Sequence, residues 1–213
     1  MASVEAVEFL GIRGSLHQPD DPNGDGLVLT HGAGSSCRSP LLTALADEFC
    51  AAGFAVLRYD LPFRQLRPTG PPIRTADKDQ QGIAAAIDWM KDRVSGRVFA
   101  GGHSYGGRMT TMLAASQPKL AAGLLLLSYP LHPPKSPTQL RSAHFPKLTT
   151  PALFVHGMRD GFGTIDEVAA ALKLVTAKTE LLPIEGAGHE LLTKKNAGEL
   201  PSTVLDAFRK FFL

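Results

Sequence analysis

One serine in this sequence lies in a setting that can make its hydroxyl a nucleophile. The pentapeptide Gly102-His103-Ser104-Tyr105-Gly106 directly follows an apolar run, Arg97 to Ala100, and directly precedes a helical pattern. A serine can stand exposed at a tight strand-to-helix turn only when its neighbours at −2 and +2 have almost no side chain, as Gly102 and Gly106 do. The pattern predicts a nucleophile elbow at Ser104, with a glycine-rich turn for packing or phosphate binding as the alternative.

A serine nucleophile needs a base, and the base needs an acid that orients it. The apolar run Ala152 to Val155 is followed by Asp160, and His189 follows the last such run. The chain order serine, acid, histidine is the one found where the serine lies on a strand-to-helix elbow. Taken singly, Asp160 fits a turn or helix-capping role and His189 fits a polar loop. Together with Ser104 they predict a Ser-His-Asp triad at one edge of a sheet.

A third motif, His31-Gly32-Ala33-Gly34, follows the apolar run Leu27 to Thr30. Acyl transfer needs two backbone donors for the oxyanion, one after the nucleophile and one from this kind of loop. We expect these donors to be the amides of Tyr105 and Ala33. The alternative is a dinucleotide-binding loop, because the motif begins like G-x-G-x-x-G, but the sixth position is Cys37 rather than glycine.

Two proline-rich segments follow expected strands and are too long to be simple connections. Residues 60–74 include Arg64 and Arg67, and residues 129–150 include His132. Connections that leave the carboxyl ends of parallel strands line the ligand crevice. We expect Arg64, Arg67 and His132 to contact substrate, since arginines on a rim attract carboxylate or phosphate groups. The alternatives are that the arginines pair with surface acids such as Asp77 and Asp79 and that His132 is a solvated loop residue.

Arg108 follows Ser104 by four residues, which is one helical turn along the same face. We expect it to form a structural ion pair with a carboxylate such as Asp60, with direct substrate contact as the alternative. Cys37 is expected to be a small buried hydrophobic residue rather than a nucleophile.

The elements that must position these residues alternate along the chain, with short apolar runs between helical patterns. This order is typical of a mostly parallel sheet with helices on both faces. The expected strands are Val4 to Phe9, Arg13 to His17, Leu27 to Thr30, Phe54 to Tyr59, Arg97 to Ala100, Ala122 to Leu127, Ala152 to Val155 and Thr179 to Leu182. The expected helices are Leu41 to Ala51, Thr75 to Val94, Tyr105 to Ser116, Asp166 to Thr176 and Pro201 to Phe212.

Composition narrows the class of protein. With 22 Lys+Arg against 20 Asp+Glu, the net charge of +2 provides no basic face for nucleic acid.

We expect a single domain over residues 1–213 and no separate cap domain. The most apolar run, Leu120 to Leu131, is too short to cross a bilayer. Two cysteines are too few for a disulfide framework, and residues 1–8 lack a basic signal region, so we expect a cytoplasmic location.

These motifs together resemble the α/β-hydrolase superfamily over essentially the whole chain. Within it the sequence resembles the small cap-less branch related to dienelactone hydrolase. It is more similar still to a branch that includes a testis-expressed protein and a subunit of a non-specific-lethal histone-acetyltransferase complex. The further points of likeness are Arg58-Tyr59-Asp60-Leu61-Pro62-Phe63, Gly106-Gly107-Arg108 and Ser128-Tyr129-Pro130-Leu131-His132-Pro133-Pro134.

The resemblance implies a serine hydrolase that cleaves a small ester, or a thioester or amide, without a metal or organic cofactor. Dienelactone hydrolase uses a cysteine nucleophile, whereas this chain has Ser104. Its lactone substrate is therefore not carried over. The rival hypothesis is a catalytically idle fold that serves as a protein-interaction module, as likeness to a complex subunit implies.

Overall fold

The computed structural model describes residues 2–9 and 11–213. Among these residues the strands form one eight-stranded sheet in the order β1-β2-β4-β3-β5-β6-β7-β8. The first two strands form an antiparallel hairpin, β2 joins β4 antiparallel, and the six strands from β4 to β8 run parallel. The strands are Ser3–Phe9 (β1), Ile12–Gln18 (β2), Gly26–Thr30 (β3), Ala55–Tyr59 (β4), Val98–His103 (β5), Leu124–Leu127 (β6), Ala152–Gly157 (β7) and Thr179–Ile184 (β8).

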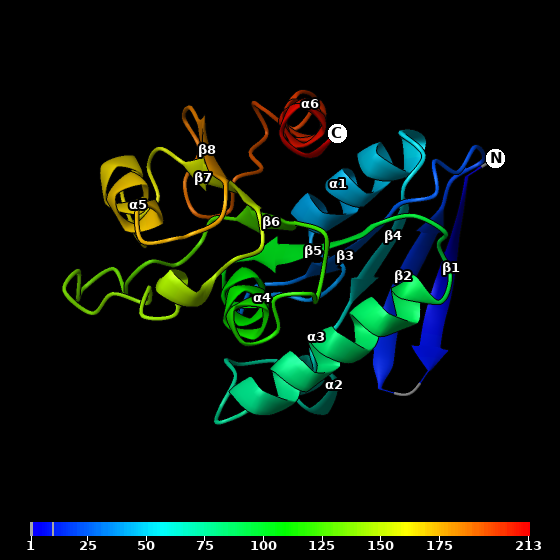
Figure 1. Ribbon diagram of the computed structural model, residues 1–213, viewed down its shortest axis with the longest axis horizontal. Helices are drawn as coiled ribbons and strands as arrows, with labels where there is room; N and C mark the ends of the chain where they lie inside the picture. The colour runs from blue at the N-terminus through cyan, green and yellow to red at the C-terminus, as the bar shows by residue number, and fades with distance from the viewer. Residues whose placement is uncertain (1, 10) are drawn as a thin grey trace.

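Helices cover both faces of this sheet, as the alternation of side chains in its central strands requires. Leu27 and Leu29 of β3 pack with α1 and α6, whereas Val28 packs with α3 and α4 on the other face. Figure 1 shows these two helix layers on opposite sides of the strands. The helices are Pro40–Ala51 (α1), Pro62–Leu66 (α2), Ala76–Lys91 (α3), Tyr105–Ser116 (α4), Ile165–Leu172 (α5) and Leu200–Phe212 (α6), with a 3₁₀ turn at Phe145–Lys147 (η1). The predicted mostly parallel α/β sheet is confirmed.

Two elements differ from their expected bounds for local reasons. The expected strand Arg97 to Ala100 continues to His103, because Gly101 and Gly102 still pair with β3. The strand therefore runs directly into Ser104. In contrast, the helix expected over residues 166–176 ends at Leu172, where the amides that follow bond to carbonyls three residues back instead of four.

Both proline-rich segments leave carboxyl ends of strands at the edge of the sheet where β5 ends. Residues 60–74 follow β4 and contain the short α2, while residues 128–151 follow β6 and contain a single 3₁₀ turn, η1. In the part of the chain that the structure describes, no helix is both long and apolar enough to span a bilayer.

Candidate active site

Ser104 lies at a sharp backbone turn between β5 and α4. Its φ of 50° and ψ of −113° lie outside the regions that non-glycine residues usually occupy. The turn packs closely against β3, where a Cβ atom on Gly102 or Gly106 would overlap atoms of Thr30. Such backbone strain costs about 1–3 kcal/mol and persists where the surrounding structure enforces it, commonly at functional sites.

The structure brings Ser104, His189 and Asp160 together in one chain of hydrogen bonds. Ser104 Oγ lies 2.8 Å from His189 Nε2, and His189 Nδ1 lies 2.8 Å from Asp160 Oδ2. An ionised carboxylate only accepts, so Nδ1 carries the proton and Nε2 is left to accept from the serine hydroxyl. This arrangement is the one in which an imidazole can remove the serine proton.

The carboxylate of Asp160 is fully buried. Its second oxygen, Oδ1, accepts a hydrogen bond of 2.8 Å from the Phe162 amide. Burial alone would raise the pKa of Asp160, but the hydrogen bonds from His189 and Phe162 outweigh it, and the pKa lies below its usual value. Asp160 is therefore an anion at neutral pH, in direct contact with the imidazole.

Phe162 and His103 restrain the loop that carries His189. The sequence motifs predicted no role for either residue. The Phe162 ring stacks on the His189 ring, with centroids 4.2 Å apart. His103 Nε2 donates to the His189 carbonyl at 2.8 Å. Burial lowers the pKa of His103, so its ring is neutral and carries its proton on Nε2. His103 lies inside the elbow motif, whereas no sequence pattern marks Phe162.

The loop after β3 is tied to the elbow by the Gly106 amide, which donates to the His31 carbonyl at 3.1 Å. His31 Nε2 accepts from the Leu61 amide at 3.0 Å. Burial lowers the pKa of His31 and keeps the ring neutral. Among the hydrogen bonds of the described residues, none uses the amides of Ala33 and Tyr105. Both predicted donors are thus free to bind an oxyanion.

Arg64 holds this loop in place. Its Nε donates to the Ser35 carbonyl and its Nη2 to the Ala33 carbonyl, both at 2.7 Å. The carbonyls of Gly70 and Arg67 each accept a further bond of 3.1 Å. The Arg64 side chain is buried and its donors are used by backbone carbonyls, and its contact with substrate stays a prediction.

Tyr105, whose amide is one of the two free donors, is anchored by a buried acid. Its hydroxyl donates to Asp79 Oδ2 at 2.7 Å. Asp79 is 0% exposed and also accepts from the Phe63 amide and the Thr75 hydroxyl. Burial, together with the bond to Asp79, raises the pKa of Tyr105, so the phenol remains a donor. The sequence gives no sign that Asp79 anchors Tyr105, because Asp79 resembles an ordinary acid in the first turn of a helix.

His132 and Arg67 do not join the triad. The buried His132 ring lies 2.9 Å from the Pro133 carbonyl and 3.4 Å from Glu167 Oε2. The His132 ring is thus directed to Glu167 of α5, and its contact with substrate stays a prediction. Arg67 is exposed, and its role in substrate binding stays a prediction.

The expected ion pair between Arg108 and Asp60 is wrong. Asp60 Oδ2 pairs with Arg13 at 3.2 Å, and its Oδ1 accepts from the Cys37 amide at 2.8 Å. Burial, reinforced by Asp60, raises the pKa of the Cys37 thiol to about 11. Cys37 is therefore protonated at neutral pH and is a poor nucleophile.

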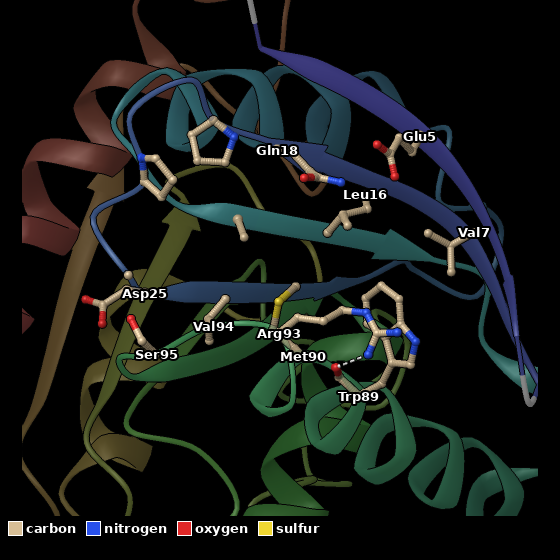
Figure 2. A pocket seen from close by; sticks show the side chains of 14 residues that line it. Glu5, Val7, Leu16, Gln18, Asp25, Trp89, Met90, Arg93, Val94 and Ser95 are labelled. Atoms are coloured by element: carbon tan, nitrogen blue, oxygen red, sulfur yellow. Dashed lines mark hydrogen bonds between the residues drawn. The ribbon is translucent and has the colours of Figure 1, made fainter.

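A cavity of about 500 Å³ lies between the β1–β2 hairpin and the end of α3 (Figure 2). Leu16 and Gln18 of β2 line it together with Trp89 and Met90 of α3. The Arg93 guanidinium stacks 3.7 Å from the centre of the Trp89 ring. The lining of this cavity does not include Ser104, His189 or Asp160, so the cavity is separate from the candidate active site.

Comparison with known proteins shows the family and the fold of this chain. The alpha/beta hydrolase domain family matches residues 24–211. Dienelactone hydrolase from Anabaena variabilis has a TM-score of 0.78 at 21% identity, over 100% of this chain and 99% of that chain. Est1E from Butyrivibrio proteoclasticus has a TM-score of 0.76 at 18% identity, over 97% and 98%. An alpha-beta serine hydrolase homologue from Coxiella burnetii also reaches 0.76, at 16% identity over 96% of both chains.

Proposed function

The chain belongs to the alpha/beta hydrolase domain family and has the α/β-hydrolase fold, and from that premise we propose that it is a serine hydrolase that cleaves small esters. The observation that carries the proposal is the continuous chain of hydrogen bonds from Ser104 through His189 to Asp160. A scaffold protein has no physical need for a buried carboxylate, an oriented imidazole and a strained serine in one line.

In the proposed reaction, Ser104 Oγ attacks the ester carbonyl carbon while His189 Nε2 takes its proton. The carbonyl oxygen becomes an oxyanion, which the amides of Ala33 and Tyr105 stabilise. His189 then returns the proton to the departing alcohol, which leaves an acyl group on Ser104. Water, activated by the same imidazole, releases the acid and restores the serine. Asp160 keeps the Nδ1 proton in place and stabilises the imidazolium.

We infer that the acyl group is short, since the segment after β6 contributes only one 3₁₀ turn over this edge of the sheet. Without a helical lid, a long acyl chain gains little of the ~0.8 kcal/mol available per buried methylene. Thioesters and amides are alternative substrates. Both cysteines, Cys37 and Cys50, are free thiols, which is the form expected in the cytoplasm, where we place the reaction.

The test is hydrolysis of p-nitrophenyl acetate and butyrate by the full chain and by Ser104→Ala and His189→Ala. We expect each variant to lose about 10⁴-fold or more in kcat. Ser116→Ala, at the far end of the same helix, is the matched control and should keep wild-type turnover. Equal turnover by Ser104→Ala would reject the proposed nucleophile, and a folded wild type inactive on all esters, thioesters and amides tried would favour the interaction module.

A further inference from the structure

Arg108 lies one turn along α4 from the proposed nucleophile. Its amide donates to the Ser104 carbonyl at 2.9 Å, so the two residues are separated by about 6 Å along the helix axis. Side chains on a helix lean toward its N-terminus. The Arg108 side chain therefore leans back toward the turn that carries Ser104.

One nitrogen of the Arg108 guanidinium is buried without a hydrogen-bond partner, although the residue is partly exposed. Its Nε is buried and, within the described residues, makes no hydrogen bond. Two acids that could be expected to pair with it have other partners, because Asp60 pairs with Arg13 and Asp79 accepts from Tyr105. A buried donor without an acceptor costs about 1–3 kcal/mol. A bound anion would remove that cost.

Three groups from the segment after β6 lie near Arg108, and one of them, Arg141, adds a second positive charge. The other two, Tyr129 and His144, are neutral at pH 7. The Tyr105 hydroxyl, which donates to Asp79, lies near Arg108 on the same helix. Burial and the nearby Arg108 charge lower the pKa of Arg141, and the same two causes lower the pKa of His144 to about 4. No carboxylate contributes to the pKa of Tyr129, Arg141 or His144. Within the described residues, neither Arg108 nor Arg141 is in an ion pair with a carboxylate.

Neutral hydrogen bonds fix this segment against α4. The Tyr129 hydroxyl donates to the Arg141 carbonyl at 2.7 Å, and His144 Nε2 lies 2.9 Å from Thr111 Oγ1. These bonds fix the segment that carries Arg141, whose guanidinium donates through Nη1 to the Pro130 carbonyl at 3.4 Å. Arg108 and Arg141 are both partly exposed, so a ligand can reach them from solvent.

We propose that Arg108, assisted by Arg141, is a carboxylate-binding subsite beside Ser104, and that the substrate is a monoester of a short dicarboxylic acid. The free carboxylate accepts hydrogen bonds from the guanidinium while the ester carbonyl lies at Ser104. Because Arg108 follows Ser104 by a single helical turn, we expect a short acyl chain to reach both groups. This inference rests on the proposed esterase activity and specifies its substrate class.

The experiment compares p-nitrophenyl monoesters of glutarate and adipate with the same compounds capped as neutral methyl esters, after subtraction of the enzyme-free rate. The measured quantity is the ratio of kcat/KM for the acid to kcat/KM for its neutral counterpart. We expect the wild type to prefer the acid by about tenfold or more, and Arg108→Gln to lose about 10- to 100-fold of that ratio, as for hydrogen bonds to a charged group. Arg108→Lys should keep part of it, since a point charge replaces the fork.

Arg209→Gln is the matched control, because it removes the same charge from an exposed position on α6, across the sheet. Its ratio should equal that of the wild type. Arg141→Gln should lower the ratio less than Arg108→Gln does, and it serves as the second test if Arg108→Gln does not fold. Labelling of Ser104 by a neutral alkyl fluorophosphonate reports separately on the nucleophile.

Two results would overturn the subsite alone. The first is a wild type that hydrolyses both esters with a ratio near one. The second is an Arg108→Gln protein whose rates on acid and neutral ester and whose labelling all fall together, which would make Arg108 structural. A wild type that neither turns over any ester nor labels at Ser104 would reject the proposed function itself, and the subsite with it.

Discussion

Replacing Asp160 by asparagine removes the negative charge of the side chain and keeps its size and shape. The carboxylate uses both of its oxygens as acceptors, Oδ1 from the Phe162 amide and Oδ2 from His189 Nδ1. His156 Nε2 also lies 3.6 Å from Oδ2. Asparagine has one acceptor oxygen and one NH₂ group, so it cannot satisfy both donors.

Each orientation of the amide has a consequence that follows from these contacts. If its oxygen stays with Phe162, the NH₂ group faces His189 Nδ1 and moves the imidazole proton to Nε2, which then cannot accept from Ser104. If the amide turns over, its NH₂ group faces the Phe162 amide, so that two buried donors meet. This contact costs about 1–3 kcal/mol of stability. The first orientation is favoured. With the negative charge also lost, we expect kcat to fall about 10³- to 10⁴-fold, or about 4–5 kcal/mol in the barrier.

The assay is kcat on p-nitrophenyl butyrate, with thermal unfolding to show that Asp160→Asn is folded. Asp166→Asn is the matched control, since Asp166 is exposed in the first turn of α5, and it should keep wild-type activity. If Asp160→Asn keeps more than about a tenth of kcat, the role of the acid assigned here is refuted.

Three further changes test other parts of the structure. Gly106→Ala should destabilise the fold by about 1–3 kcal/mol in urea unfolding, because its Cβ would overlap Thr30; a gain in stability, as at an open helix position, would contradict this. Arg64→Met should lower kcat on neutral esters and change KM less, because the loop after β3 loses its anchor. A change only in KM for anionic esters would instead support direct contact of Arg64 with substrate. The pKa of His144 is lowered to about 4 from 6.5, so the unfolded chain binds the extra proton, and stability should fall as pH drops from 6.5 toward 4. His144→Gln should flatten that slope in urea titrations, and an unchanged slope would contradict the assignment.

The elements and the proximity of Ser104, His189 and Asp160 could be predicted because their signals are local. A continuous apolar run marks β3 as a strand buried on both faces, and paired glycines mark the elbow at Ser104. Asp160 and His189 each follow the end of a parallel strand, and parallel strands end at the same edge of the sheet. The structure accordingly places these side chains within hydrogen-bond distance.

The roles of the charged residues could not be predicted, because the type of a charged residue does not identify its partner. Arg64 is buried against carbonyls about thirty residues earlier in the chain, a contact that depends on how two loops pack. Asp60 pairs with Arg13 across two strands rather than with Arg108. Asp79 anchors Tyr105 through a helix contact with no sequence signature.

The most direct measurement of the central claim is labelling of the whole chain with an alkyl fluorophosphonate, followed by mass-spectrometric mapping of the modified residue. If Ser104 is the nucleophile and His189 its base, we expect one adduct, on Ser104, that is absent from Ser104→Ala and forms far more slowly in His189→Ala. An adduct on another residue, or labelling of Ser104→Ala at the wild-type rate, would contradict it.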